Sequence, residues 1–176
     1  MAATKHTLVA LVENKPGVLN RVANLFRRRG FNIESITVGH SETPDVSRMT
    51  IVVDGSGTSV EQVRKQLDKL IETLKVQDIT NDPIVVRELA LVKVRATSTT
   101  RSEIMQIVDI FRANIVDVSM ESLTIEVTGD EEKLDSLLNL LRTFGVKEVV
   151  RTGRIAMTRG GGTVSETVRK SSDGEE

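Results

Sequence analysis

The sequence predicts an α+β protein built from two ferredoxin-like units, each with the element order βαββαβ. Apolar residues occur partly in short runs typical of strands and partly at the three-and-four spacing of amphipathic helices. The same order of elements occurs before and after the turn-forming run Asn81-Asp82-Pro83. At 176 residues, the chain is long enough for two small hydrophobic cores.

The first half contains six expected elements, which we assign to a domain at residues 5–80. Its second helix is expected to begin at a capping box, Thr58-Ser59-Val60-Glu61, and to keep one apolar face as far as Leu74. The elements are a strand at 7–12, a helix from Val18 that ends before Gly30, strands at 32–38 and 46–54 separated by a polar loop at 39–45, the capped helix, and a short strand at 76–80.

The second half repeats this order in a domain expected at residues 88–157, after a linker at 81–87. Residues 158–176 are expected to form a flexible tail, because their Gly, Ser and charged side chains bury too little apolar surface to become ordered. The elements of the second domain are a strand at 88–96, a helix that opens with a capping box from Thr100 to Glu103, strands at 115–120 and 123–127, a helix capped by Asp130, and a strand at 146–150.

The composition excludes several classes of protein. The 24 Lys and Arg residues nearly balance 25 Asp and Glu residues, so no overall charge attracts nucleic acid or an anionic membrane. The absence of cysteine excludes disulfides and thiolate chemistry, and the two histidines, His6 and His40, lie far apart in the sequence. No apolar run approaches the ~20 residues of a membrane span, and the first strand leaves no room for a signal peptide. We therefore expect a cytoplasmic protein.

The junction between the first strand and the first helix has the composition of an anion site. Asn14 is expected to cap the helix, Pro16 suits a first helical turn, and Gly17 permits a ligand to approach the backbone closely. The free N–H groups of such a helix terminus suit a carboxylate or a phosphate. The alternative is an ordinary strand-to-helix turn without a ligand. The second half carries a different run, Thr97-Ser98-Thr99-Thr100-Arg101, so the two halves are expected to share a fold and not a site.

Three motifs at characteristic spacings extend this interpretation. They are the Asn-Lys-Pro-Gly-Val-Leu run within residues 13–22, the Arg-Gly-Phe-Asn-Ile-Glu run within 29–36, and the Ser-Arg-Met-Thr-Ile run at 47–51. Together they resemble the N-terminal ACT domain of the small, regulatory subunit of acetohydroxyacid synthase, also called acetolactate synthase. The strand from Glu88 and the second half match the layout of that family, so the resemblance covers roughly residues 5–159.

The resemblance implies a function in branched-chain amino-acid biosynthesis. Members of the family form homodimers through paired ACT domains, bind valine or another branched-chain amino acid between them, and enhance and feedback-inhibit a catalytic large subunit. Thiamine diphosphate, Mg and FAD are implied on that large subunit, whereas this chain is implied to bind no cofactor, no nucleic acid and no membrane, and to have no catalytic residues. The implied effector residues are Asn14, Gly17, Val18 and Leu19 of one chain, with Asn32 and Ile33 of its partner.

Each of these residues has a simpler interpretation. Val18, Leu19 and Ile33 follow the core periodicity. The Arg27-Arg28-Arg29 run could grip a phosphate or an acidic partner, but such a run is typical of a solvated helix end. His40, and a cluster of Arg48 with Asp45 and Asp54, remain alternatives for a catalytic or metal site.

Two other functions remain possible for this order of elements. An acylphosphatase-like hydrolase would need an arginine in a phosphate-binding loop after the first strand, where Asn, Lys and Pro occur instead. An RNA-binding module would need aromatic residues on its central strands, and the strands at 46–54 and 123–127 contain none.

Overall fold

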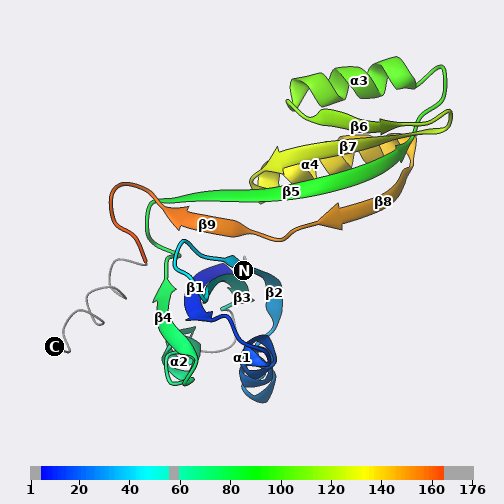
Figure 1. Ribbon diagram of the computed structural model, residues 1–176. Helices are drawn as coiled ribbons and strands as arrows, with labels where there is room; N and C mark the ends of the chain where they lie inside the picture. The colour runs from blue at the N-terminus through cyan, green and yellow to red at the C-terminus, as the bar shows by residue number, and fades with distance from the viewer. Residues whose placement is uncertain (1–4, 56–59, 165–176) are drawn as a thin grey trace. The chain divides into compact units, whose positions relative to one another are not determined.

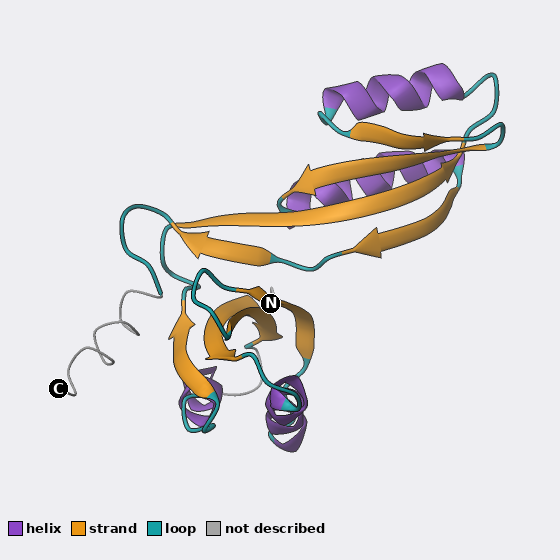
Figure 2. Ribbon diagram, in the orientation of Figure 1, coloured by secondary structure: helices purple, strands orange, loops and turns teal. Residues whose placement is uncertain are grey.

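The computed structural model describes residues 5–55 and 60–164, which form two compact units. One unit comprises the described residues up to Val85 together with those from Ile155 onward, and the other spans Val86–Arg154. Each unit contains an antiparallel sheet and two helices, which confirms the α+β class and the repeated βαββαβ order (Figures 1 and 2).

The sheet of the first unit has the strand order β2-β3-β1-β4, so β2 and β4 form its edges. Figure 1 shows α1 and α2 on one side of this sheet. The bounds are β1 Lys5–Glu13, α1 Val18–Arg28, β2 Ile33–His40, β3 Val46–Asp54, α2 Val60–Leu67 and β4 Thr73–Asp78.

The central strand β1 is buried on both faces. Leu8, Ala10 and Val12 belong to the core cluster shared with both helices. Val9 and Leu11 point to the opposite side of the sheet, because side chains alternate along a strand, yet they are only 0% and 2% exposed. This burial confirms the prediction of a buried apolar strand and explains why no polar residue alternates with the apolar ones.

The second unit has the strand order β6-β7-β5-β8, and α3 and α4 share one hydrophobic core beneath it. Asp130 accepts a hydrogen bond from the Lys133 backbone N–H at 2.9 Å, which confirms it as the cap of α4. The bounds are β5 Ile84–Arg95, α3 Arg101–Ile110, β6 Asn114–Val118, β7 Ser122–Gly129, α4 Glu131–Leu141, a 3-10 turn Arg142–Phe144 and β8 Val146–Arg151.

Helix α2 ends at Leu67, so the prediction that it extends to Leu74 was wrong. Backbone bonds from Lys69 N–H to the Gln66 carbonyl and from Leu70 N–H to the Leu67 carbonyl tighten the chain into a turn. The next residues leave the helix because pairing of β4 with β1 supplies their hydrogen bonds. Thr58 and Ser59 of the capping box predicted for this helix lie outside the described residues.

Helix α3 does not begin with the capping box predicted from Thr100 to Glu103. Thr100 makes no side-chain cap bond to the helix. Instead, the Thr97 hydroxyl accepts the Thr100 N–H at 3.3 Å, and the Thr100 hydroxyl accepts the Thr97 N–H at 3.0 Å. This reciprocal pair has the pattern of a capping box, but it lies in the turn that precedes α3.

A buried ion pair joins two strands of the second unit. Both carboxylate oxygens of Glu88 accept hydrogen bonds from Arg151, each at 2.8 Å, and the Glu88 side chain is only 10% exposed. The pair raises the pKa of Arg151 above its ordinary value, chiefly through the hydrogen bonds that Arg151 donates to Glu88. Arg151 also bonds Asp135 at 2.8 Å, but the Asp135 side chain is 51% exposed.

We therefore expect Glu88→Gln to lower the free energy of unfolding by about 2 kcal/mol, because one buried partner of a charged pair is removed. Asp135→Asn serves as the control, with an expected loss below about 1 kcal/mol at its exposed position. Urea denaturation measures both. Equal losses for the two variants would show that burial of Glu88 contributes nothing.

The described residues that follow the second unit, 155–164, belong to the first unit. Strand β9 (Ile155–Thr158) is followed by Arg159, whose backbone N–H donates to the Pro83 carbonyl at 2.7 Å. Val164 is only 4% exposed. Sequence analysis placed residues 159–164 in a polar tail because Gly160-Gly161-Gly162 dominate their composition, and composition does not reveal these contacts. Residues 165–176 lie outside the described part of the chain.

Candidate functional site

The loop between β1 and α1 is attached by its backbone to two neighbouring strands. Glu13 N–H donates to the Glu72 carbonyl at 2.8 Å, just before β4 begins. Asn14 N–H donates to the Asp45 carbonyl at 2.8 Å, just before β3 begins. These bonds fix the start of the loop, so the turn that follows has a defined position at one end of the sheet.

Gly17 is the residue that opens helix α1. It occupies the N-cap position with φ 87° and ψ −12°, in the left-handed region that favours glycine. No side chain caps the helix, so the prediction that Asn14 does so was wrong; the Asn14 backbone is directed toward Asp45, and Pro16 lies in the preceding turn. A Cβ atom added to Gly17 would meet nothing within 4 Å, so the space in front of the helix is open.

The charges around this turn favour an anion. The first turn of α1 contains no acidic residue. The carboxylate of Glu13 is paired with Lys15 at 2.8 Å, and this contact raises the pKa of Lys15 above its ordinary value. Glu72 is hydrogen-bonded to Arg21. With the nearby carboxylates paired, the uncapped N–H groups and the positive end of the helix dipole are available to an anionic group.

The predicted effector residues differ in exposure. Asn14 and Gly17 are exposed, and Leu19 is 48% exposed. Val18 is 5% exposed and belongs to the core cluster, so in this chain it packs as the simpler interpretation proposed. Ile33 is half-buried against the same cluster, while Asn32 is exposed.

Within one chain the two groups of effector residues lie at opposite ends of the sheet. Glu13, next to the loop, pairs with Val46 at the beginning of β3. Ile33 pairs with Val53 near the other end of β3. The structure therefore does not bring Asn32 and Ile33 to Gly17 in a single chain, and a pocket containing both groups requires residues from a second chain.

The alternative sites of the first unit are not supported by the geometry. Asp45 and Asp54 flank opposite ends of β3, so they form no cluster with Arg48. Arg48 donates to the Ala156 carbonyl at 2.9 Å, and burial lowers its pKa below the ordinary value. Among residues 5–55 and 60–164, no three His, Cys, Asp or Glu side chains are grouped to hold a metal ion.

The RNA-binding alternative also lacks its required surface. All four phenylalanines pack in or against the two core clusters, so none is left on a sheet face for base stacking: Phe26, Phe31, Phe111 and Phe144. No helix in the described residues is both long enough and apolar enough to cross a membrane.

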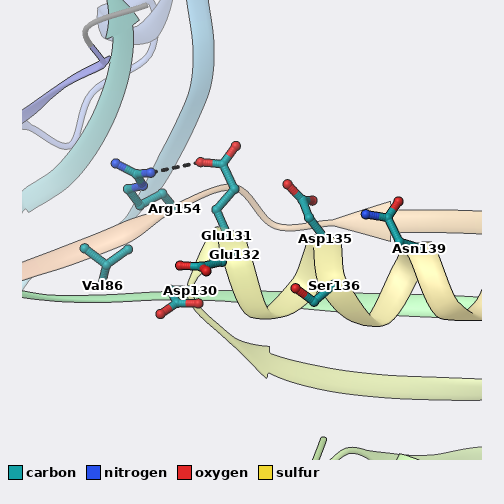
Figure 3. Close-up of a pocket in the computed structure, with 8 residues that line it drawn as sticks. All are labelled: Val86, Asp130, Glu131, Glu132, Asp135, Ser136, Asn139 and Arg154. Atoms are coloured by element: carbon teal, nitrogen blue, oxygen red, sulfur yellow. Dashed lines mark hydrogen bonds and ion pairs between the residues drawn. The ribbon is translucent and has the colours of Figure 1, made fainter. Parts of the chain in front are cut away.

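An acidic cleft of about 580 Å³ lies along α4 in the second unit (Figure 3). Three of its four carboxylates already have structural roles. Asp130 caps the helix, Glu131 pairs with Arg154 at 3.0 Å, and Asp135 pairs with Arg151. These interactions give the carboxylates a role in stabilising the second unit, so we assign no ligand to the cleft.

Comparison with known proteins finds relatives over most of the chain. A family model described as "AHAS small subunit-like ACT domain" matches residues 8–75, and one described as "Small subunit of acetolactate synthase" matches residues 87–160. A protein of Archaeoglobus fulgidus named "Probable acetolactate synthase small subunit" is 61% identical, over 89% of this chain and 98% of its own length. The "Acetolactate synthase small subunit" of Mycolicibacterium smegmatis is 54% identical, over 88% of this chain and 91% of its own.

A solved structure agrees with both the fold and the family. The acetolactate synthase small subunit from Thermotoga maritima has a TM-score of 0.82 and 49% sequence identity, and the match covers 89% of this chain and 98% of that one. Its fold and its sequence therefore correspond over nearly the whole length described. The chain belongs to the family of acetolactate synthase small subunits, which are regulatory partners of a catalytic large subunit.

Proposed function

We propose that this chain enhances the catalytic large subunit of acetolactate synthase in the cytoplasm and confers feedback inhibition by valine. The observation that carries the proposal is the open, uncapped N-terminus of α1 at Gly17, with no acidic residue in its first turn. Such a terminus suits the carboxylate of a free amino acid. The chemistry of acetolactate synthesis, with thiamine diphosphate, Mg and FAD, is assigned to the large subunit.

The strand register supports a pocket shared by two copies. Strand β2 is an edge strand, so its free backbone groups are available to a second chain. His40 ends β2 at the same end of the sheet as Val12, because both residues pair with Ser47. If two β2 strands pair antiparallel about a two-fold axis, the beginning of the partner's β2 lies beside His40. The second copy's residues 32–33 would then approach the end of the sheet that carries Gly17.

The proposed pocket matches each part of an amino acid. The carboxylate binds the N–H groups that follow Gly17, and the Asn14 amide, both donor and acceptor, bridges the charged groups. Leu19, in the first turn of α1, offers an exposed apolar side chain here, and Ile33 of a second copy would complete an apolar wall for a branched side chain. Because only the dimer contains the whole pocket, valine would stabilise that dimer, with a coupling of about 1 to 3 kcal/mol.

We also propose a division of labour between the domains. Residues 5–80, which carry the Asn-x-Pro-Gly loop, sense the amino acid. Residues 88–157, which lack this loop, support activation of the large subunit. The test of the proposed function is co-purification of the chain with its large subunit, followed by acetolactate assays with and without valine, leucine or isoleucine. Unchanged activity on addition of this chain, and no effect of any of the three amino acids, would refute it.

Asn14→Ala separates ligand binding from stability. The side chain is exposed and caps no helix, so we expect the free energy of unfolding to change by less than about 0.5 kcal/mol. Valine binding should weaken by about 1 to 3 kcal/mol through lost hydrogen bonds to charged groups. Titration calorimetry and thermal denaturation measure the two quantities. A large loss of stability with unchanged valine affinity would show that Asn14 has a structural role instead.

A further inference from the structure

A basic groove lies at the opposite end of α1 from the effector loop. Helix α1 has 11 residues, which separates its two ends by about 16 Å. The groove has a volume of about 600 Å³ and runs between the end of α1 and helix α2. Its lining residues are Arg28, Arg29, Phe31, Gln62, Val63, Lys65, Gln66 and Lys69.

The cations of this groove are incompletely neutralised. No acidic residue lines it. Among the described residues, Arg28, Arg29 and Lys69 make no ion pair. Lys65 lies 3.6 Å from Glu61, whose carboxylate is held mainly by two shorter bonds from Arg64. The arginine run alone is typical of a solvated helix end, but the fold places Lys65 of α2 and Lys69, just after α2, beside it, and this convergence creates a positive field that favours an anionic partner.

The backbone around the groove does not suit a compact phosphate. Helix α1 presents its C-terminal end here, where its dipole is negative, whereas α2 runs antiparallel to α1 and lines the groove from Gln62 in its first turn to Lys69 just beyond its end. The nearby backbone donors are already used: Gly30 N–H bonds the Arg27 carbonyl, Phe31 N–H bonds the Phe26 carbonyl, and Lys69 N–H bonds the Gln66 carbonyl. Beside the C-terminus of α1, a phosphate would therefore find long side chains, and the N–H groups of Gly30, Phe31 and Lys69 would not be available to hold it.

These features fit an extended acidic peptide better. Separate Arg and Lys side chains can each meet a different carboxylate along such a segment. Phe31 and Val63 supply an apolar floor, and the Gln62 and Gln66 amides can bond a peptide backbone. The family provides one protein partner, the catalytic large subunit. We infer that this groove binds an acidic segment of the large subunit. This inference rests on the proposed function. The groove would then be a surface through which the two subunits contact each other.

The test uses charge reversal in the full-length chain. Arg28→Glu and Lys69→Glu are made separately and together, and Arg27→Glu is the matched control, because Arg27 is an exposed neighbour on the same helix that does not line the groove. Affinity for the purified large subunit is measured at several salt concentrations, and valine binding to the chain alone is measured in parallel. We expect each groove variant to weaken subunit binding by about tenfold and the double variant by about a hundredfold, with a smaller salt dependence.

The control and the second readout separate the possible outcomes. Arg27→Glu should stay within about threefold of the unmodified chain, and all variants should bind valine normally. Equal affinities of the groove variants and Arg27→Glu for the large subunit would overturn the inference. Binding of tripolyphosphate that is lost in the double variant, with subunit affinity unchanged, would also overturn it and identify a small-anion site. If the unmodified chain does not bind the large subunit, the proposed function fails as well.

Discussion

Replacement of Gly17 by aspartate should abolish valine binding and feedback inhibition while enhancement of the large subunit persists. The new carboxylate would occupy the open space in front of α1, where the carboxylate of the amino acid is proposed to lie. Loss of charge-assisted hydrogen bonds, about 1.5 to 3 kcal/mol, adds to like-charge repulsion. We therefore expect valine affinity to fall by more than about a hundredfold, which titration calorimetry would detect.

The variant should remain folded. A side chain at φ 87° costs about 1 kcal/mol of backbone strain, which a negative charge at a helix N-terminus partly offsets. Gly17→Ala is the matched control, since it introduces the same strain without charge and its Cβ atom meets no neighbour. Its valine affinity should fall by less than about tenfold. If Gly17→Asp binds valine as tightly as Gly17→Ala does, the ligand carboxylate does not lie at this terminus.

Periodicity predicts the fold well where a segment has one dominant partner. Strand β1 and the inward face of α4 follow their apolar patterns closely, because burial fixes those positions whatever the rest of the chain does. Helix α2 shows the limit. Leu70, Ile71 and Leu74 extend its helical spacing, but Thr73 pairs with Val12 across the sheet, and that long-range pairing ends the helix. The spacing of apolar residues alone cannot show whether such a segment continues a helix or forms a strand, because strand pairing with a distant part of the chain decides it.

The sequence predicted the position of the candidate turn but not its geometry. The run from Asn14 to Leu19 indicated an anion-binding turn, and the structure places an open helix N-terminus there. The cap was assigned to Asn14 because asparagine is a favoured N-cap residue, but the bond from its backbone to Asp45 turns the chain and leaves Gly17 in that position. Only the strand register reveals that Asn32 and Ile33 lie at the other end of the sheet.

The C-terminal segment has the largest expected effect on stability. Residues 155–164 belong to the same compact unit as β1, although the whole second unit separates them in sequence. Ala156 and Val164 are 6% and 4% exposed, and the Ala156 carbonyl accepts a bond from the partly buried guanidinium of Arg48. Removing this segment leaves the half-buried guanidinium of Arg48 without its acceptor. The free energy of unfolding should therefore fall by more than the lost apolar contacts alone would predict.

A chain that ends at Arg154 should therefore be less stable in its first unit by about 4 kcal/mol, from lost burial of two apolar side chains and from two or three lost hydrogen bonds. A chain that ends at Val164 is the control and should unfold at the same temperature as the full chain, because it keeps the whole segment. Thermal denaturation followed by circular dichroism compares the full chain with the two truncated chains, and the unfolding temperature of the chain ending at Arg154 should decrease by about 10 °C or more.

The valine affinity of the chain ending at Arg154 should also fall, because Arg48 lies on β3, the strand whose first residues adjoin the effector loop at Asp45. Equal unfolding temperatures for the chains ending at Arg154 and Val164 would show that residues 155–164 rest on the first unit without stabilising it.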